Sequence, residues 1–358
     1  MDPLIFEPYF RPQVWGGRRL ERYLGRPLPG ESPLGEAWML SAQSLHVSRV
    51  AEGPLQGMLL SELWASRAEE LIGRQPAAAG GFPLLIKFLD CQELLSVQVH
   101  PSDQLARRLG SDEWGKTEAW VVIEAEPTAR ICAGLRPGTT RRELERHLDA
   151  GTVAECLHWF VPQQGQCLLL PAGTVHAAGG GVLLAEVQQT SDATFRLFDW
   201  NRLGPDGQPR TLHRQEALLS IDWTAGPVGP TAGSPIAGLP AGNLAEHLVA
   251  CPYFSLDRFR LAAPLELPEK RGQNYLPASP PSPAISRTPE NSSDPFFTQR
   301  LSIWMVLEGS AVLSSDATGY RRQCGRGETV LLPASARGLR WEPASEGAAA
   351  TLLGVLPP

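Results

Sequence analysis

Glycine and proline interrupt this chain so often that long helices have little room to form. Its 358 residues include 35 glycines and 33 prolines, a composition that favours short strands joined by tight turns. Apolar runs of four to eight residues, the usual length of a strand, lie between these breaks. The clearest runs cover 119–125, 129–135, 166–170, 182–188, 194–200, 302–307, 311–314 and 329–332. We therefore expect a mainly β protein built from sandwiches or jelly rolls, with few short helices.

Three segments carry helical signals. Apolar residues recur at helical spacing over about 60–71. Ser102 or Asp103 can cap a second, short helix. Thr140 begins a capping-box pattern ahead of a helical segment at about 140–158.

The length of the chain favours two compact units. A stretch rich in glycine and proline, 225–242, suggests the boundary between them. We place a larger domain at 1–240 and a smaller one at 241–358. Proline, serine and asparagine dominate 277–294, which is typical of a long surface loop.

The net charge and the spacing of the cysteines limit which partners and which cellular compartment we expect. The formal net charge is −6, so there is no basic field to hold nucleic acid. The N-terminus lacks a signal-peptide pattern and no apolar window is long enough for a membrane span. The six cysteines are far apart without a C-x-x-C pair, which indicates reduced, buried thiols. We expect a cytoplasmic protein with no nucleic-acid or membrane partner, and a monomer because no association motif stands out.

The sharpest local signal is the segment 96–101. On a strand, Ser96, Gln98 and His100 project to one face, because residues two apart share a side. Such a polar row in an apolar sheet is costly unless it is hydrogen bonded or coordinated. A lone strand histidine is more often an ordinary core or surface residue, so this segment alone is weak evidence for a ligand.

Two further motifs strengthen the metal interpretation. Lys116 and Glu118 share one face at the start of the next apolar run, although a surface ion pair would explain them equally well. The pattern Gly165-x5-Pro171-x-Gly173-x-x-His176 resembles the second motif of the cupin superfamily. Two histidines, a carboxylate and an amide oxygen make a mixed set that suits zinc or another divalent first-row ion, with a position left open.

Many motifs, in order, resemble type I mannose-6-phosphate isomerase (phosphomannose isomerase), a cupin, in the short form found in bacteria. The resemblance spans roughly residues 10–220. It is carried by Trp15-Gly16-Gly17, Gly35-Glu36-Ala37-Trp38, Pro83-Leu84-Leu85-Ile86-Lys87, Gln98-Val99-His100-Pro101, Gly115-Lys116-Thr117-Glu118-Ala119-Trp120, Pro171-Ala172-Gly173-Thr174-Val175-His176-Ala177 and Glu186-Val187-Gln188-Gln189-Thr190-Ser191-Asp192-Ala193-Thr194-Phe195-Arg196.

The resemblance implies one zinc ion per chain and a set of site residues. Its implied ligands are Gln98, His100, Glu118 and His176. It also implies Arg196 as the active-site arginine, with Lys116, Glu186 and Ser96 lining the cavity, and Arg202 as a candidate phosphate anchor. Two simpler explanations stay open, namely that Glu186 and Arg196 form a buried ion pair and that Arg202 is solvated.

The implied reaction interconverts D-mannose 6-phosphate and D-fructose 6-phosphate through an enediol-type intermediate. Negative charge then develops on two sugar oxygens, which Arg196 and Lys116 could stabilise. We nominate Glu186 as the base. The chain as a whole is acidic, but the cationic residues Lys116, Arg196 and Arg202 would attract a sugar phosphate to the site.

The C-terminal part resembles a cupin half without its metal site. Gly327 and Pro333 stand where the first half has its turn residues, while Arg337 and Gly338 occupy the region of the histidine. We therefore expect a degenerate cupin-like domain there.

Three other functions stay open. A cupin oxygenase is one, since one fold hosts many chemistries, although oxygenases usually use a histidine-rich set. A non-catalytic sugar-binding cupin is the second, and an isomerase of another aldose phosphate is the third.

Overall fold

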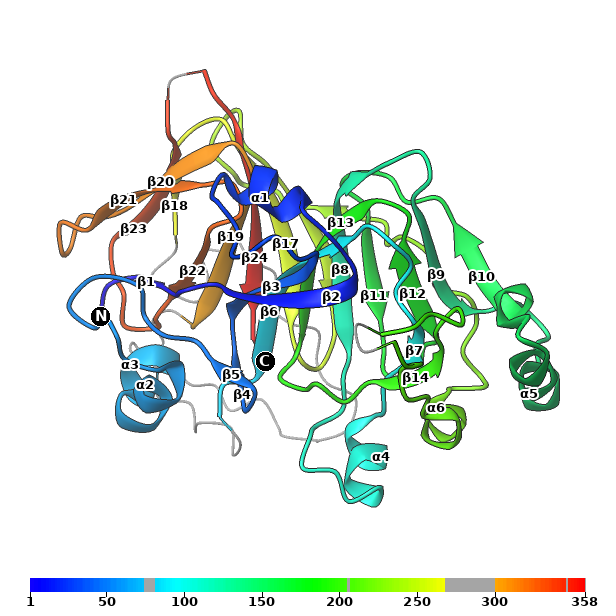
Figure 1. The fold of residues 1–358 in the computed structure, drawn as a ribbon. Coiled ribbons are helices and arrows are strands. Elements are labelled where there is room, and N and C mark those ends of the chain that lie inside the picture. Colours follow the sequence, from blue (N-terminus) through cyan, green and yellow to red (C-terminus); the bar gives the residue numbers. More distant parts are fainter. Residues whose placement is uncertain (74–80, 205–206, 268–299, 346, 358) are drawn as a thin grey trace, which may run out of the picture. The chain divides into compact units, whose positions relative to one another are not determined.

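The computed structural model describes residues 1–73, 81–204, 207–267, 300–345 and 347–357 (Figure 1). The surface loop predicted at 277–294 lies outside the described residues. Within the described part, no helix is both long and apolar enough to cross a membrane.

The contacts between residues divide the chain into two units, each built from separate stretches. Unit 1 consists of Met1–Glu7, Val47–Pro83 and Ala232–Pro358, and unit 2 of Pro8–His46 and Leu84–Thr231. The domain boundary expected at residue 240 stays a prediction.

Unit 2 contains two antiparallel sheets. The first has the strand order β11-β8-β13-β6-β3-β2 and the second the order β10-β9-β12-β7-β14. The strands of the first sheet are β2 (Tyr9–Gly17), β3 (Leu34–Leu40), β6 (Leu84–Cys91), β8 (Glu118–Ala125), β11 (Cys167–Leu170) and β13 (Val182–Gln189). Those of the second are β7 (Val97–Val99), β9 (Arg130–Leu135), β10 (Leu157–Phe160), β12 (His176–Gly179) and β14 (Phe195–Phe198).

The two sheets of unit 2 pack face to face. Alternate residues from both inner faces form one buried cluster, which includes Trp120 and Leu184 from the first sheet and Ile131 and Ala178 from the second. Alternation along each strand sends every second side chain into this layer. A second cluster covers the outer face of the second sheet, where Val97 and the helices meet.

Helices cover that outer face because each has one apolar side. The elements involved are α5 (Arg141–Ala150), the 3₁₀ helix η1 (Val153–Cys156) and α6 (Arg214–Ser220). Thr140 caps α5, as predicted, by accepting from the backbone N–H of Glu143 at 3.2 Å. Unit 2 also has α1 (Arg19–Leu24), α4 (Asp103–Arg108), which Ser102 caps, and β4 (Ala42–Gln43), while β5 (His46–Val47) lies where the chain leaves it.

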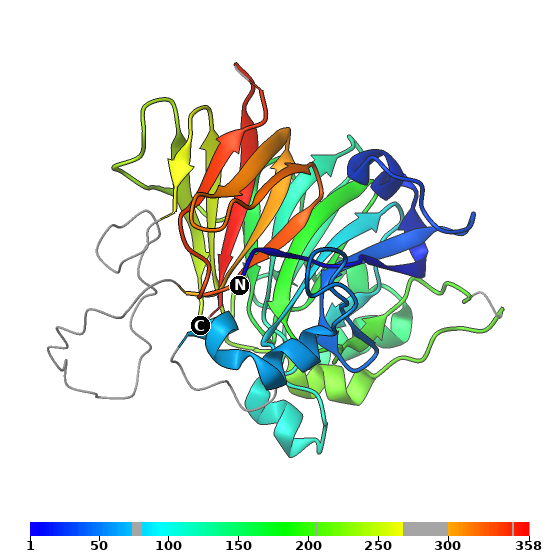
Figure 2. The same ribbon diagram turned by 90° about the vertical axis from the view of Figure 1, so that its left-hand side faces the viewer.

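Unit 1 is a second sandwich of two antiparallel sheets, whose yellow, orange and red strands Figure 2 shows from the side. Its core includes Phe259, Trp304 and Trp341, with ring centroids 5.1 and 6.1 Å from that of Trp304. The larger sheet contains β1 (Leu4–Ile5), β22 (Thr329–Leu332), β19 (Ser302–Glu308), β24 (Ala350–Leu356), β17 (Ser255–Leu261), β16 (Leu244–Ala250) and β15 (Ser234–Pro235). The smaller contains β18 (Leu265–Glu266), β23 (Leu339–Pro343), β20 (Ser310–Ser315) and β21 (Arg321–Gly325).

The mainly β prediction is confirmed, with one correction among the helices. The single helix expected at about 60–71 is two helices, α2 (Leu60–Ser66) and α3 (Ala68–Ile72), because Arg67 has φ −135° and ψ 30° and leaves the helical conformation. All six cysteines are free, five of them buried, which agrees with the expectation of reduced thiols.

Candidate metal centre and active site

One row across the second sheet of unit 2 carries three of the predicted site residues. Gln98 on β7 lies directly opposite His176 on β12 and, on its other side, opposite Arg196 on β14. Residues in register on neighbouring antiparallel strands share a face. Val97 and Val99 point the other way, into the cluster beneath the helices. The row therefore faces the first sheet.

The first sheet supplies acidic and basic groups to the same layer. Glu118 and Gln188 lie opposite each other on β8 and β13, and Glu186 lies opposite both Trp120 on β8 and Lys87 on β6. These positions alternate with apolar residues on the outer face of the sheet.

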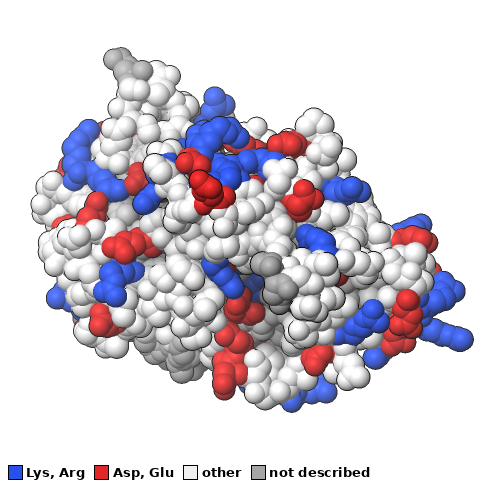
Figure 3. All heavy atoms as spheres, in the orientation of Figure 1, with Lys and Arg blue, Asp and Glu red and all other residues white. Residues whose placement is uncertain are grey.

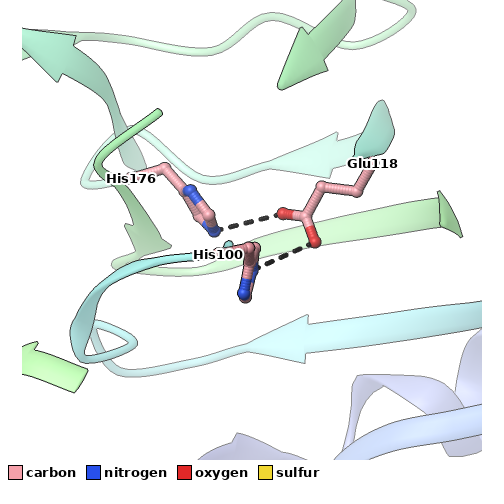
Figure 4. A group of neighbouring side chains, drawn as sticks. All are labelled: His100, Glu118 and His176. Carbon is pink, nitrogen blue, oxygen red and sulfur yellow. Dashed lines mark ion pairs between the residues drawn. The ribbon is translucent and has the colours of Figure 1, made fainter. Parts of the chain in front are cut away.

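His100, Glu118 and His176 meet between the two sheets (Figure 4). The Oε1 atom of Glu118 lies 3.1 Å from Nε2 of His176, and its Oε2 atom lies 3.4 Å from Nε2 of His100. All three side chains are buried, and their ligand atoms lie within 4.8 Å of one another. Gln98 adjoins them, with its Nε2 3.1 Å from Nε2 of His176. This group could hold a metal ion.

Each histidine is oriented by its other ring nitrogen. Nδ1 of His100 lies 2.9 Å from the carbonyl oxygen of Ala193, and Nδ1 of His176 lies 2.8 Å from that of Thr174. A carbonyl oxygen can only accept, so each Nδ1 carries a proton, and each Nε2 is the ring nitrogen that faces Glu118. Ligating histidines in metal sites are held in this way.

The carboxylate of Glu118 also fits a metal ligand. It is fully buried, and its two oxygens face the ammonium group of Lys116 and the Nε2 atoms of the two histidines. Burial alone would raise the pKa of Glu118, but Lys116 and the two histidines hold it well below its usual value. Burial, with Lys116, lowers the pKa of His100 to about 3. The centre thus combines an ionised carboxylate with a neutral imidazole, the forms that bind a divalent ion.

The turn before His176 is built on Gly173. Its φ is +91°, a conformation that favours glycine, and a Cβ atom there would lie 3.1 Å from Asp222. Its backbone N–H donates to the carbonyl oxygen of His100 at 2.9 Å. The cupin-like motif therefore joins the two histidines through the backbone.

Lys116 bridges the carboxylate and one histidine. Its Nζ lies 2.8 Å from Oε2 of Glu118 and 3.1 Å from Nε2 of His100, and it is buried. The pair with Glu118 is thus not the surface ion pair that the sequence left open. On the face shown in Figure 3, by contrast, basic and acidic side chains are interspersed at the surface.

Glu186 pairs with Lys87, a residue that the sequence analysis did not assign to the site. The two charged groups lie 3.1 Å apart, and Trp120 donates to the other carboxylate oxygen of Glu186 at 3.0 Å. Burial raises the pKa of Glu186, with Lys87 and Lys116 opposing. One open alternative was a buried ion pair between Glu186 and Arg196. Glu186 does form a buried ion pair, but its partner is Lys87. A lysine inside the apolar run of β6 was the missed signal, since a buried lysine needs an anion.

The arginines form a separate cluster around Asp199. Arg202 donates to Asp199 at 2.6 Å and to the carbonyl oxygen of Leu94, and Arg210 donates to both oxygens of Asp199 at 2.5 and 2.7 Å. Arg196 donates to the carbonyl oxygen of Thr211 at 2.8 Å, and burial, with Arg210, lowers its pKa. Arg202 is therefore held by protein groups. Of the three arginines, the sequence predicted Arg196 and Arg202 as site residues but not Arg210.

Two further predictions concern single residues. Ser96 is buried immediately before β7. In unit 1, Arg337 stands in the region of the missing cupin histidine and donates to the carbonyl oxygens of Ala334 and Ala336.

Comparison with known proteins agrees with this geometry. Residues 4–117 match the family described as phosphomannose isomerase type I, catalytic domain. The chain is 35% identical over 271 residues to mannose-6-phosphate isomerase ManA of Bacillus subtilis, a match that covers 75% of this chain and 83% of that protein. It is 34% identical over 271 residues to mannose-6-phosphate isomerase of Streptococcus mutans, covering 74% and 81%.

Solved structures share the fold. The mannose 6-phosphate isomerase of Bacillus subtilis superposes with a TM-score of 0.82 and 28% identity, covering 99% of both chains. A mannosephosphate isomerase of Archaeoglobus fulgidus, described as putative, superposes with a TM-score of 0.71 and 20% identity, covering 100% of this chain and 98% of the other. The expected cupin architecture is therefore confirmed.

Proposed function

This chain belongs to the type I mannose-6-phosphate isomerase family, and from that premise we propose that it interconverts D-mannose 6-phosphate and D-fructose 6-phosphate with one zinc ion. The observation that carries the proposal is the carboxylate of Glu118, buried between two inward-facing imidazole nitrogens beside Glu186 and Lys116. Such a centre offers both a cation site and groups for proton transfer.

The residues that would hold the zinc ion are Gln98, His100, Glu118 and His176. Reversing the amide of Gln98 would turn its oxygen toward the centre, and amide nitrogen and oxygen have nearly the same shape. When bound, zinc would supply Lewis-acid polarisation of the two sugar oxygens between which the carbonyl group moves.

The protein's own groups would perform the proton transfer. We propose that Glu186 removes the proton from C2 of the aldose and returns it to C1, while O1 gains a proton and O2 loses one, which gives the ketose. Its raised pKa supports this role, because a more basic carboxylate accepts a proton more readily. Lys116 and Arg196 would stabilise the negative charge that develops on the sugar oxygens.

The arginine cluster supports a phosphorylated substrate. We propose that Arg202 anchors the phosphate, with Asp199 fixing its side chain, and that Ser96 lines the cavity. A guanidinium held by a neighbouring carboxylate is preorganised for a second anion.

We also propose that the enzyme is monomeric and cytoplasmic. Six free cysteines support a reducing compartment. Size-exclusion chromatography with light scattering would test the monomer.

The deciding experiment follows fructose 6-phosphate formation from mannose 6-phosphate by the purified protein, before and after chelation. We expect chelation to abolish the activity and added zinc to restore it. Other aldose phosphates, assayed in parallel, serve as controls. A folded, zinc-loaded protein that turns over another aldose phosphate but not mannose 6-phosphate would overturn the assigned substrate.

A further inference from the structure

A continuous series of ion pairs leads from the metal-binding group to the surface of unit 2. Successive charged atoms lie no more than 3.9 Å apart, and the signs alternate. In order, the members are Asp192, Arg11, Glu36, Lys87, Glu186, Lys116 and Glu118. Only Asp192 and Arg11, at one end, have substantial exposure, and the other five are buried.

Glu36 is the third member of this series and is fixed in place. Gln13 donates to its Oε1 atom at 2.5 Å, and Trp38 donates to its Oε2 atom at 2.7 Å. Gly35 permits the close approach of β2, because a Cβ there would lie 2.6 Å from that of Gln13. A carboxylate with a donor on each oxygen has little freedom to turn.

Lys87 is shared between Glu36 and Glu186, at 3.5 and 3.1 Å. Burial alone would lower the pKa of Lys87, but the two carboxylates together raise it above its usual value. Burying a charge is costly, and well-packed apolar residues would stabilise a fold as well as a buried ion pair does. The series of ion pairs ends at Glu118, so these buried charges can act on the site.

We propose that Glu36 is a positioning residue for the isomerase, which acts through Lys87 on Glu186. The inference deepens the proposed function and rests on it. Because Glu36 shares the ammonium group of Lys87, Glu186 does not hold this cation alone. The Glu186 carboxylate thereby stays available to the substrate.

The first test compares a substitution that removes the charge of Glu36 with one that shortens its side chain. Glu36→Gln keeps the shape and removes the charge, whereas Glu36→Asp keeps the charge and shortens the side chain. We expect kcat to fall about 10-fold to 100-fold in Glu36→Gln with KM changed less than about threefold, since misplacement of a reacting group costs this much. Glu36→Asp should retain more activity than Glu36→Gln. A packing role predicts the opposite order, which would overturn the inference.

A double-mutant cycle tests whether Glu36 acts through Lys87. If it does, Glu36→Gln should cost almost nothing further in kcat once Lys87→Met is present. Independent, multiplicative losses would overturn the proposal. Zinc content is measured on every variant, and we expect it to stay at the wild-type level.

Asp90→Asn provides the matched control. Asp90 is also a buried carboxylate on β6, paired with Arg19 at 3.0 Å, but it points to the opposite face from Lys87. We expect it to lower the melting temperature and leave kcat unchanged. If Glu36→Gln fails to fold, Gln13→Met removes one donor to Glu36 and should lower kcat about threefold or more, and an unchanged kcat there would refute the role of Glu36.

The outcomes separate the two proposals. Wild-type protein that does not isomerise mannose 6-phosphate would sink the proposed function and this inference with it. Active wild-type protein with an unaltered Glu36→Gln variant would sink the inference alone.

Discussion

Lys87 and Glu186 face each other in register on neighbouring strands, and their charged groups form a buried ion pair of 3.1 Å. The proposed base, Glu186, is therefore buried beside a cation and away from bulk water. Its chemistry can therefore be tested by changes that preserve its shape.

Glu186→Gln should abolish most of the activity and leave the metal in place. The amide has the shape of the carboxylate but cannot accept the proton, and loss of a general base costs about 10²-fold to 10⁴-fold in kcat. Steady-state kinetics and metal analysis on the same preparation check both parts. Glu124→Gln, on β8 and paired with Arg22 at the surface, is the control. Wild-type kcat in Glu186→Gln would remove Glu186 from the mechanism.

His176→Ala and Arg196→Ala should separate metal binding from catalysis. We expect the first to lose zinc and activity together, because it removes a nitrogen ligand. The second should keep zinc and lose about 10²-fold to 10³-fold in kcat, as expected when a donor to developing charge is removed. A metal-free Arg196→Ala protein would contradict this division of roles. Metal content by mass spectrometry and kcat by coupled assay are the measurements.

Asp257 in unit 1 should make stability depend on pH in an unusual direction. Burial raises its pKa to about 6, with His247 at 2.8 Å opposing the shift. The folded pKa exceeds the unfolded value of about 3.9, so the folded state binds more protons between these values. The free energy of unfolding therefore falls, by about 1–3 kcal/mol from this group, as pH rises from about 4 to about 6.

Asp257→Asn should remove that slope, because the amide does not titrate. Urea unfolding of both proteins between about pH 4 and about pH 7 measures the difference. The stability of the wild type relative to Asp257→Asn should decline with rising pH. A difference that is flat, or that grows with pH, would show that Asp257 ionises normally in the folded protein.

Thr140→Ala should destabilise α5 by about 1 kcal/mol, because the backbone N–H of Glu143 loses its acceptor. The melting temperature should fall by about 2–4 °C. Arg146→Ala, whose side chain is 72% exposed on the same helix, should change stability by less than about 0.5 kcal/mol. Equal shifts in both variants, measured by calorimetry, would argue against the cap.

Local patterns predicted the metal-binding group better than its surroundings. His100 and His176 follow strand and turn signals that can be read within a few residues. Glu118 and Lys116 share a face because they are two apart, and the structure brings both to the histidines. These are short-range regularities, and a single sequence displays them directly.

Partners from distant strands could not be read in this way. Lys87 meets Glu186 from a strand almost a hundred residues earlier in the chain, and only sheet order decides that β6 lies beside β13. The alternation of apolar and polar residues predicts which face of the sheet a residue lies on, but it does not predict which strand lies beside it. The same limit explains why Asp199 was not predicted as the partner of Arg202.

The shortness of β7 makes the centre sensitive to chain length. Only Gln98 of its three residues faces inward, and its neighbours Val97 and Val99 fill the layer beneath the helices. Strand faces have a period of two, so one residue inserted ahead of β7 would exchange its faces. A valine would then stand beside His100, Glu118 and His176, and the glutamine would enter an apolar layer. Such an insertion would therefore change the face that β7 presents to this group, even in a chain that keeps all of these side chains.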